Sequence, residues 1–227
     1  SKRTPNPSEI NMLYLGRFER RKGIYELCVA FGTLTKKYPN LKLHLVGSGQ
    51  PRTPIPWFNR VDVETKVMKR ILKRGSVPSD RYVLHGVKRG TEKENIINDA
   101  DFVILPSYFE TFCLVGLEAI NQARPLISSK GPALNEVYIE SGLAYPIDFG
   151  ELRYNSGVNS QGFVRLRVEK IVEAVSGFID NLDEYRLRSE QVWQLVQRNS
   201  ELFNWVSIAK NTKIVYDSLI QNGLVPN

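Results

Sequence analysis

Short apolar runs and amphipathic segments alternate along most of the chain. Apolar runs at residues 11–15, 41–46, 82–85, 102–105, 126–128 and 143–147 predict buried strands. Apolar residues recur every three or four positions after the first run, at Ile24, Leu27, Cys28 and Phe31, as they do in helices. Further helices are expected at 61–72, 91–99, 114–122, 133–139 and from Leu166 onward. This order predicts an α/β fold: a Rossmann-like, mostly parallel sheet with helices on both faces, followed by C-terminal helices.

Composition allows an ordinary soluble domain. A chain of 227 residues, 42% hydrophobic and 24% charged, is long enough to bury a full core in one or two domains. Apolar runs stay far below the roughly 20 residues of a membrane span. Cys28 and Cys113 differ in sequence context, so we expect two free thiols in a reducing compartment and a cytoplasmic location. The two histidines lie in strand-like runs, and the sequence shows no metal-binding constellation.

The net charge of +7 raises the question of a nucleic-acid partner. The basic residues are scattered among 24 acidic ones and form no sustained run. A solvated surface, an anionic membrane or a phosphorylated ligand accounts for them equally well. We therefore expect no nucleic-acid partner and leave open a peripheral membrane contact through the full-length protein.

Charged residues gather where two predicted strands end. Glu110 and Glu118 follow the apolar run 102–105 and its Pro106 break, at a turn and on the helix after it. Ligands of open α/β sheets bind at the carboxyl ends of strands, so two acids lie where a polar ligand would sit. Arg17 and Lys22 flank the turn after the first strand, where a helix begins. Helix N-termini bind anions, Arg grips phosphate through two hydrogen bonds, and Lys acts as a point charge.

These motifs, in this order, resemble the donor-binding domain of retaining glycosyltransferases with the GT-B fold, the large group often called family 4. The resemblance covers most of the chain. It is carried by Leu13-Tyr14-Leu15-Gly16-Arg17-Phe18 with Lys22-Gly23, Val46-Gly47-Ser48-Gly49, Val83-Leu84-His85-Gly86, Asn98-Asp99-Ala100-Asp101, the paired Glu110 and Glu118, and Gly131-Pro132-Ala133-Leu134-Asn135-Glu136. Phe203-Asn204-Trp205 also resembles the family's aromatic break before the last helix.

The resemblance implies transfer of a sugar from a nucleoside-diphosphate sugar to an acceptor, with retention of configuration and without metal or cofactor. Residues 1–227 would form the donor-binding domain of the enzyme. The acceptor would be bound by an N-terminal domain that this chain does not include, and the chain alone would then be inactive. A natural stand-alone domain is the alternative.

The resemblance also assigns roles to residues. Arg17 and Lys22 would bind the diphosphate and stabilise the leaving group, and Gly16 would let the backbone approach it. Glu118 would accept hydrogen bonds from the ribose and Glu110 would orient the transferred sugar. The backbone N–H groups of Phe112, Cys113 and Leu114 would face the phosphates. The expected catalytic residues are therefore Glu110, Arg17 and Lys22, whereas Arg20 and Arg21 are expected to face solvent.

Some residues depart from the family pattern. Thr111 and Cys113 stand where glycine is usual, Gly116 stands where a larger residue is usual, and residues 50–62 and 150–163 are longer than usual. These departures put the identity of the donor in doubt. His44 is expected to be structural, and His85 to pack beside the base. Tyr108 and Phe109 either shape the sugar pocket or belong to the core.

Two other classes of function remain open. An oxidoreductase domain would need Gly-x-Gly-x-x-Gly after the first strand, but residues 16–21 contain one glycine. A non-catalytic nucleotide-binding or scaffold module would keep the same charged residues, and the sequence does not exclude it.

Overall fold

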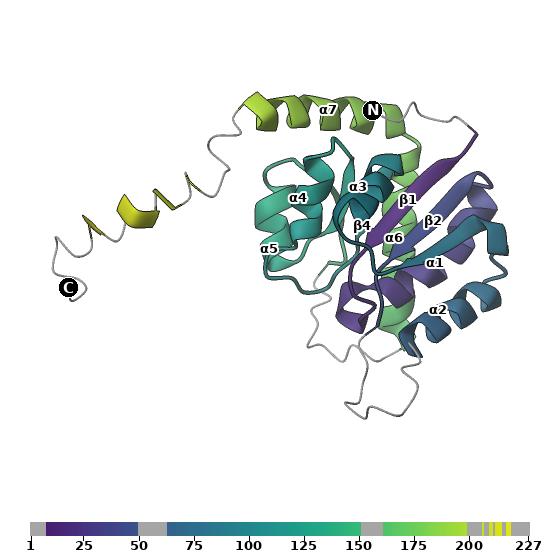
Figure 1. Ribbon diagram of the computed structural model, residues 1–227. Helices are drawn as coiled ribbons and strands as arrows, with labels where there is room; N and C mark the ends of the chain where they lie inside the picture. Colours follow the sequence, from purple (N-terminus) through teal and green to yellow (C-terminus); the bar gives the residue numbers. More distant parts are fainter. Residues whose placement is uncertain are drawn as a thin grey trace.

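One parallel sheet forms the centre of the molecule (Figure 1). The computed structural model describes residues 8–49, 63–150 and 161–198, together with scattered positions between 206 and 218. Its six strands lie in the order β3-β2-β1-β4-β5-β6, and every neighbouring pair is parallel. The strands are β1 (Ile10–Leu15), β2 (Leu41–Val46), β3 (Tyr82–Gly86), β4 (Phe102–Leu105), β5 (Leu126–Ser129) and β6 (Tyr145–Ile147). The predicted α/β fold with a Rossmann-like sheet is confirmed.

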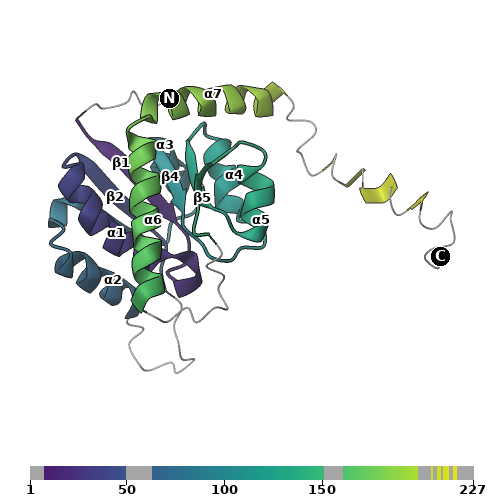
Figure 2. The same ribbon diagram turned by 180° about the vertical axis from the view of Figure 1, so that it is seen from behind.

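Helices cover both faces of the sheet, as Figures 1 and 2 show from opposite sides. One face is covered by α1 (Ile24–Lys37), α2 (Val63–Arg74) and α6 (Gln161–Ile179). The other is covered by α3 (Gly90–Asp99), α4 (Leu114–Ile120) and the single turn α5 (Pro132–Leu134). Helix α7 (Leu182–Arg198) then crosses one end of the sheet. Short 3₁₀ turns, η1 (Arg20–Lys22) and η2 (Ser79–Arg81), precede α1 and β3.

The core consists of two apolar layers separated by the central strands. Met12 and Tyr14 point from β1 into the layer beneath α1, α2 and α6, whereas Leu13 points into the layer beneath α3 and α4. All four residues of β4 are buried, as expected for a central parallel strand covered on both faces. Within the described residues, every helix is too short or too polar to cross a membrane.

The region after β5 differs from the sequence prediction. The helix expected at 133–139 is α5 followed by a wide π-type turn, η3 (Asn135–Ile139). The strand expected from residue 143 begins instead at Tyr145. The reason is that the N–H groups of Leu143 and Ala144 both donate to the carbonyl of Tyr138, at 2.9 Å, and so are taken up in closing this turn. The expected features at 50–62 and 203–205, and most of the segment 150–163, lie outside the described residues.

The order of the strands determines where a ligand can bind. From β1 the chain passes through α1 to β2 on one side, whereas from β4 it passes through α4 to β5 on the other. The two connections diverge at the carboxyl ends of β1 and β4, and ligands of open α/β sheets bind in the crevice left there. The turns at 16–23 and 106–113, which carry most of the predicted site residues, meet at this point.

Candidate functional site

The first turn is shaped by close backbone contacts between the ends of β1 and β2. Gly16 N–H donates to the carbonyl of Val46 at 3.0 Å, and Phe18 N–H donates to that of Ser48 at 3.0 Å. Gly47 has φ 138°, and a Cβ there would lie 1.9 Å from the carbonyl oxygen of Gly16. A side chain at 47 would therefore push the two loops apart. Glycine at this position keeps the backbone of Gly16 in place at the end of β1.

A second glycine joins this turn to the one after β4. Gly23 is left-handed, with φ 67°, and a Cβ there would lie 2.1 Å from the carbonyl oxygen of Pro106. Alongside this contact, Tyr108 N–H donates to the carbonyl of Arg21 at 2.8 Å. These contacts are made by backbone atoms, so they fix the distance between the two turns. They place Lys22 directly beside Glu110.

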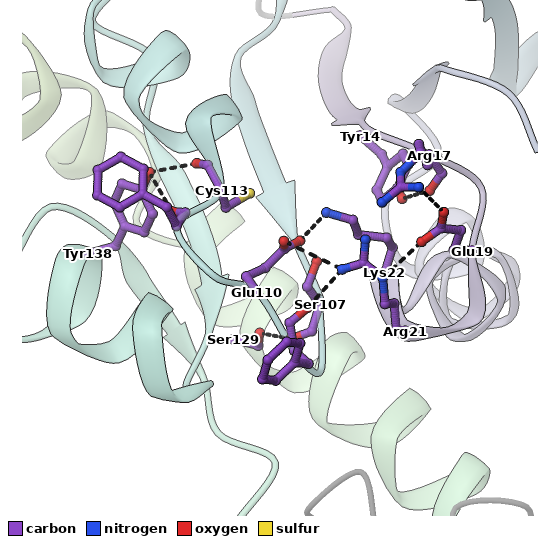
Figure 3. Close-up of polar contacts among 12 residues, drawn as sticks. Tyr14, Arg17, Glu19, Arg21, Lys22, Ser107, Glu110, Cys113, Ser129 and Tyr138 are labelled. Atoms are coloured by element: carbon purple, nitrogen blue, oxygen red, sulfur yellow. Dashed lines mark hydrogen bonds and ion pairs between the residues drawn. The ribbon is translucent and has the colours of Figure 1, made fainter.

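Glu110 lies at the centre of the site and is only 6% exposed. Its Oε1 accepts a hydrogen bond from Lys22 Nζ, and its Oε2 lies 3.7 Å from Arg21 Nη1 (Figure 3). Arg21 also donates to the carbonyl of Phe109 at 3.2 Å and pairs with Glu19 at 2.9 Å. The expectation that Arg21 faces solvent is wrong, because the backbone bond from Tyr108 brings this residue against the second turn.

Arg17 lies on the opposite side of the first turn, away from Glu110 (Figure 3). Its side chain is 51% exposed and pairs with Glu19 at 2.7 Å. An exposed ion pair is worth about 0–1 kcal/mol, so the guanidinium can turn toward a new anion at little cost. Its carbonyl accepts a hydrogen bond from Tyr14 at 2.8 Å, which holds the backbone of the turn.

Cys113 immediately precedes α4 and has a left-handed backbone, with φ 59°. This conformation is uncommon for residues other than glycine. The thiol is partly buried, and burial together with the charge of Glu110 raises its pKa to about 11. It is therefore mostly protonated at neutral pH, and this together with its partial burial slows its reaction as a nucleophile. The neighbouring Phe112 and Leu114 side chains are exposed, at 44% and 64%.

Glu118 lies one turn further along α4, in a different setting. Its side chain is 34% exposed, and its Oε1 accepts a hydrogen bond from Lys93 of α3 at 2.7 Å. Its Oε2 is buried and has no hydrogen-bond partner among the described residues. The structure therefore brings Lys22 and Glu110 together and places Arg17 and Glu118 outside this pair.

The two histidines lie next to each other on the sheet. His44 Nδ1 and His85 Nε2 are 2.9 Å apart, and His44 Nε2 lies 2.9 Å from Asn11 Oδ1. Burial and the nearby charge of Lys88 lower the pKa of His85. This arrangement agrees with a structural role for His44, whereas the base-side position expected for His85 remains a prediction. Within the described parts of the chain, no group of three or more His, Cys, Asp or Glu residues could hold a metal ion.

Two residues that shape the site carry no recognisable signal in the sequence. Arg21 follows another arginine, and only the fold distinguishes them. Tyr138 follows the second turn by 25 residues, yet its hydroxyl donates to the carbonyl of Cys113 at 2.7 Å. Of the two aromatic residues left open, Tyr108 belongs to the core, where its ring lies 3.8 Å from the Arg167 guanidinium, and Phe109 is 52% exposed.

The structure defines a Rossmann-like α/β domain with a cluster of charged residues at the switch point of its parallel sheet. Residues 1–149 match the family described as Glycosyl transferases group 1, and the chain belongs to this family.

Relatives and solved structures agree with this assignment. Glycogen synthase of Mycobacterium tuberculosis is 27% identical over 214 residues, which are 94% of this chain and 44% of that protein. The structure of sucrose-phosphate synthase from Thermosynechococcus elongatus matches with a TM-score of 0.65 and 24% identity, over 94% of this chain and 46% of that one. The structure of Anabaena HepE in complex with UDP and glucose matches with a TM-score of 0.67 and 16% identity, over 93% of this chain and 49% of that one. This chain therefore spans about half the length of each.

Proposed function

We propose that this chain is the donor-binding domain of a retaining glycosyltransferase and binds a nucleoside-diphosphate sugar at the switch point. The observation that carries the proposal is the buried contact of Lys22 with Glu110, between the exposed Arg17 and the half-exposed Glu118. This arrangement offers both cations for a diphosphate and carboxylates for hydroxyl groups. The similarity to HepE, which was solved with UDP and glucose, supports the same class of ligand.

The diphosphate would lie against the first turn. When the bond to the sugar breaks, negative charge develops on the leaving phosphate, and cations already in place stabilise it. Lys22 is held there by Glu110, and Arg17 would have to leave Glu19 and turn toward the same space. The side-chain-free surface of Gly16 lets the phosphate approach the backbone, and the N–H groups of residues 112–114 approach it from the second turn.

The two carboxylates would bind the two ends of the donor. Carboxylate oxygens accept hydrogen bonds from hydroxyl groups, and a single carboxylate can bind two adjacent hydroxyls. Glu118 has an oxygen without a hydrogen bond among the described residues, and we assign it to the ribose. Glu110 lies at the turn beside Lys22, and we assign it to the transferred sugar. The positive charge needed by the leaving group would come from Arg17 and Lys22, so the reaction would need no metal ion.

Transfer to an acceptor would require a second domain. Relatives are about twice as long as this chain, so we propose that residues 1–227 act with an acceptor-binding N-terminal domain. Holding the acceptor against the reacting carbon can account for roughly 7–11 kcal/mol of barrier reduction. A closed cleft also excludes water that would compete for the sugar. Residues 1–227 alone should therefore bind the donor without acceptor-dependent transfer.

Titration calorimetry with UDP, GDP, ADP and dTDP in EDTA tests the proposal. One of the four should bind at one site per chain, and higher salt should weaken the binding because charge supplies much of it. Binding that appears only after Mg²⁺ or Mn²⁺ is added would contradict the metal-independent mechanism. If none of the four binds with or without metal, the donor-binding proposal itself fails.

A further inference from the structure

Tyr138 lies directly beneath the second turn of the site (Figure 3). Its side chain comes from η3 and is fully buried. Its hydroxyl lies 2.7 Å from the carbonyl oxygen of Cys113 and 3.4 Å from that of Phe112. A hydroxyl has one proton to donate, and the shorter contact has the better hydrogen-bond distance. The tyrosine therefore donates to Cys113, at the residue where α4 begins.

The space for this ring is provided by Gly116. A Cβ at position 116 would lie 2.4 Å from Cζ of Tyr138 and 2.7 Å from its hydroxyl oxygen. Since Tyr138 is fully buried, its ring could not move aside without displacing the core. Glycine is a poor helix residue, and Gly116 lies inside the short helix α4. Its presence is explained by the ring that occupies the position of its missing side chain.

The hydrogen bond from Tyr138 holds a backbone conformation that is otherwise poorly supported. Cys113 is left-handed without being glycine, and its own side chain makes no hydrogen bond that caps α4. Its carbonyl accepts from Gly116 N–H at 3.0 Å and from Tyr138. Because a peptide unit is planar, fixing the Cys113 carbonyl also fixes the direction of the Leu114 N–H. Tyr138 thus contacts the peptide unit that immediately precedes α4.

We propose that Tyr138 is a positioning residue for the donor site and that Gly116 provides the space it needs. The inference rests on the proposed donor-binding function. Glu110 precedes Cys113 and Glu118 follows it on α4, so the hydroxyl fixes the placement of one carboxylate relative to the other. Tyr138 acts from beneath the turn, through the Cys113 carbonyl, and is not itself a ligand of the donor.

The variant Tyr138→Phe tests the inference because it removes the hydroxyl and keeps the ring. The first readout is alkylation of Cys113 by iodoacetamide in the folded protein. Cys28, the other cysteine of the chain, is 1% exposed, and burial raises its pKa strongly, so it stays unlabelled. Without the hydrogen bond the turn opens more often, and the Cys113 labelling rate should rise about fivefold, as expected for one lost hydrogen bond.

The second readout is affinity for whichever of UDP, GDP, ADP and dTDP the parent chain binds most tightly. Tyr138→Phe should weaken this binding about fivefold, since the turn must be ordered again before it can contact the ligand. Tyr38→Phe is the matched control. The Tyr38 hydroxyl donates to Asp180 at 2.8 Å, between α1 and the end of α6, and its loss should leave both readouts unchanged.

Gly116→Ala gives an independent check, because the added Cβ must displace the Tyr138 ring. It should raise labelling and weaken nucleotide binding at least as much as Tyr138→Phe. In a Tyr138→Leu background, the same change should have little further effect on either readout. Parent-like labelling and affinity in both Tyr138→Phe and Gly116→Ala would overturn the inference. Labelling needs no nucleotide, so it tests Tyr138 even if the proposed function fails.

Discussion

Glu110 and Glu118 lie on one short segment, yet the fold treats them differently. Glu110 is 6% exposed and contacts both Lys22 and Arg21. Glu118 is 34% exposed, pairs with Lys93 alone, and keeps one oxygen without a hydrogen bond among the described residues. The first carboxylate therefore joins the two turns of the site, whereas the second makes one ion pair between α4 and α3. We therefore expect substitution of Glu110 and substitution of Glu118 to have different effects, although both residues are glutamates on the same segment.

The largest expected effect is on stability, when each carboxylate loses its cation. Lys22→Ala leaves Glu110 buried with Arg21 at 3.7 Å as its remaining cation and should lower the free energy of unfolding by about 3 kcal/mol. Lys93→Ala removes the partner of the half-exposed Glu118 and should cost less than about 1 kcal/mol. Urea denaturation of both variants measures the difference. Equal losses in the free energy of unfolding would contradict the view that Glu110 depends more on its cation than Glu118 does.

A smaller effect is expected on ligand binding. Here substitution of Glu118 should have the larger effect on diphosphate affinity and substitution of Glu110 the smaller. Glu118→Ala should weaken the binding of the free nucleoside diphosphate and of the nucleotide sugar equally, by about 1–3 kcal/mol, because the ribose is common to both ligands. Glu110→Gln should leave the affinity for the free diphosphate unchanged, since Lys22 becomes more available to phosphate. It should lower only the affinity for the nucleotide sugar. Calorimetry with both ligands measures this, and equal losses of diphosphate affinity would reject the assignment.

The smallest effect on ligand binding is expected from substitution of Arg17, the exposed cation of the first turn. Arg17→Ala should weaken nucleoside diphosphate binding by about 1.5 kcal/mol, as for a hydrogen bond to a charged group, and should reduce its salt dependence. Arg165→Ala is the control, because that side chain is 83% exposed and pairs with Glu169 on the same helix. Titrations at two salt concentrations measure both variants. An unchanged affinity in Arg17→Ala would leave Lys22 as the main phosphate ligand.

The sequence predicted the fold better than it predicted the surroundings of the candidate site residues. Strands were recognisable because buried parallel strands are almost continuously apolar, as in β4. Lys22 and Glu110 were each named as candidate site residues because each follows a predicted strand, but their contact with each other was not predicted. The inward position of Arg21 depends on a backbone hydrogen bond from Tyr108, which no local pattern reveals.

Gly116 shows the same limit more clearly. From the sequence it is a departure from the family pattern on a helix where glycine is unfavourable. The structure relates it to Tyr138, 22 residues later, whose ring occupies the space that a Cβ would fill. A single sequence contains both residues but not their contact, so their joint role depended on the packing of η3 against α4.

Backbone amide NMR of the isotope-labelled chain tests most directly the claim that a nucleoside diphosphate binds at the switch point. Saturating nucleoside diphosphate is added in EDTA, using whichever of UDP, GDP, ADP and dTDP binds. The account predicts the largest shift changes at the amides of Gly16 and Leu114, on the two turns at the switch point. The contradicting result is a set of changes centred on Leu143 and Tyr185, which line a cavity of about 270 Å³ between α7 and the start of β6.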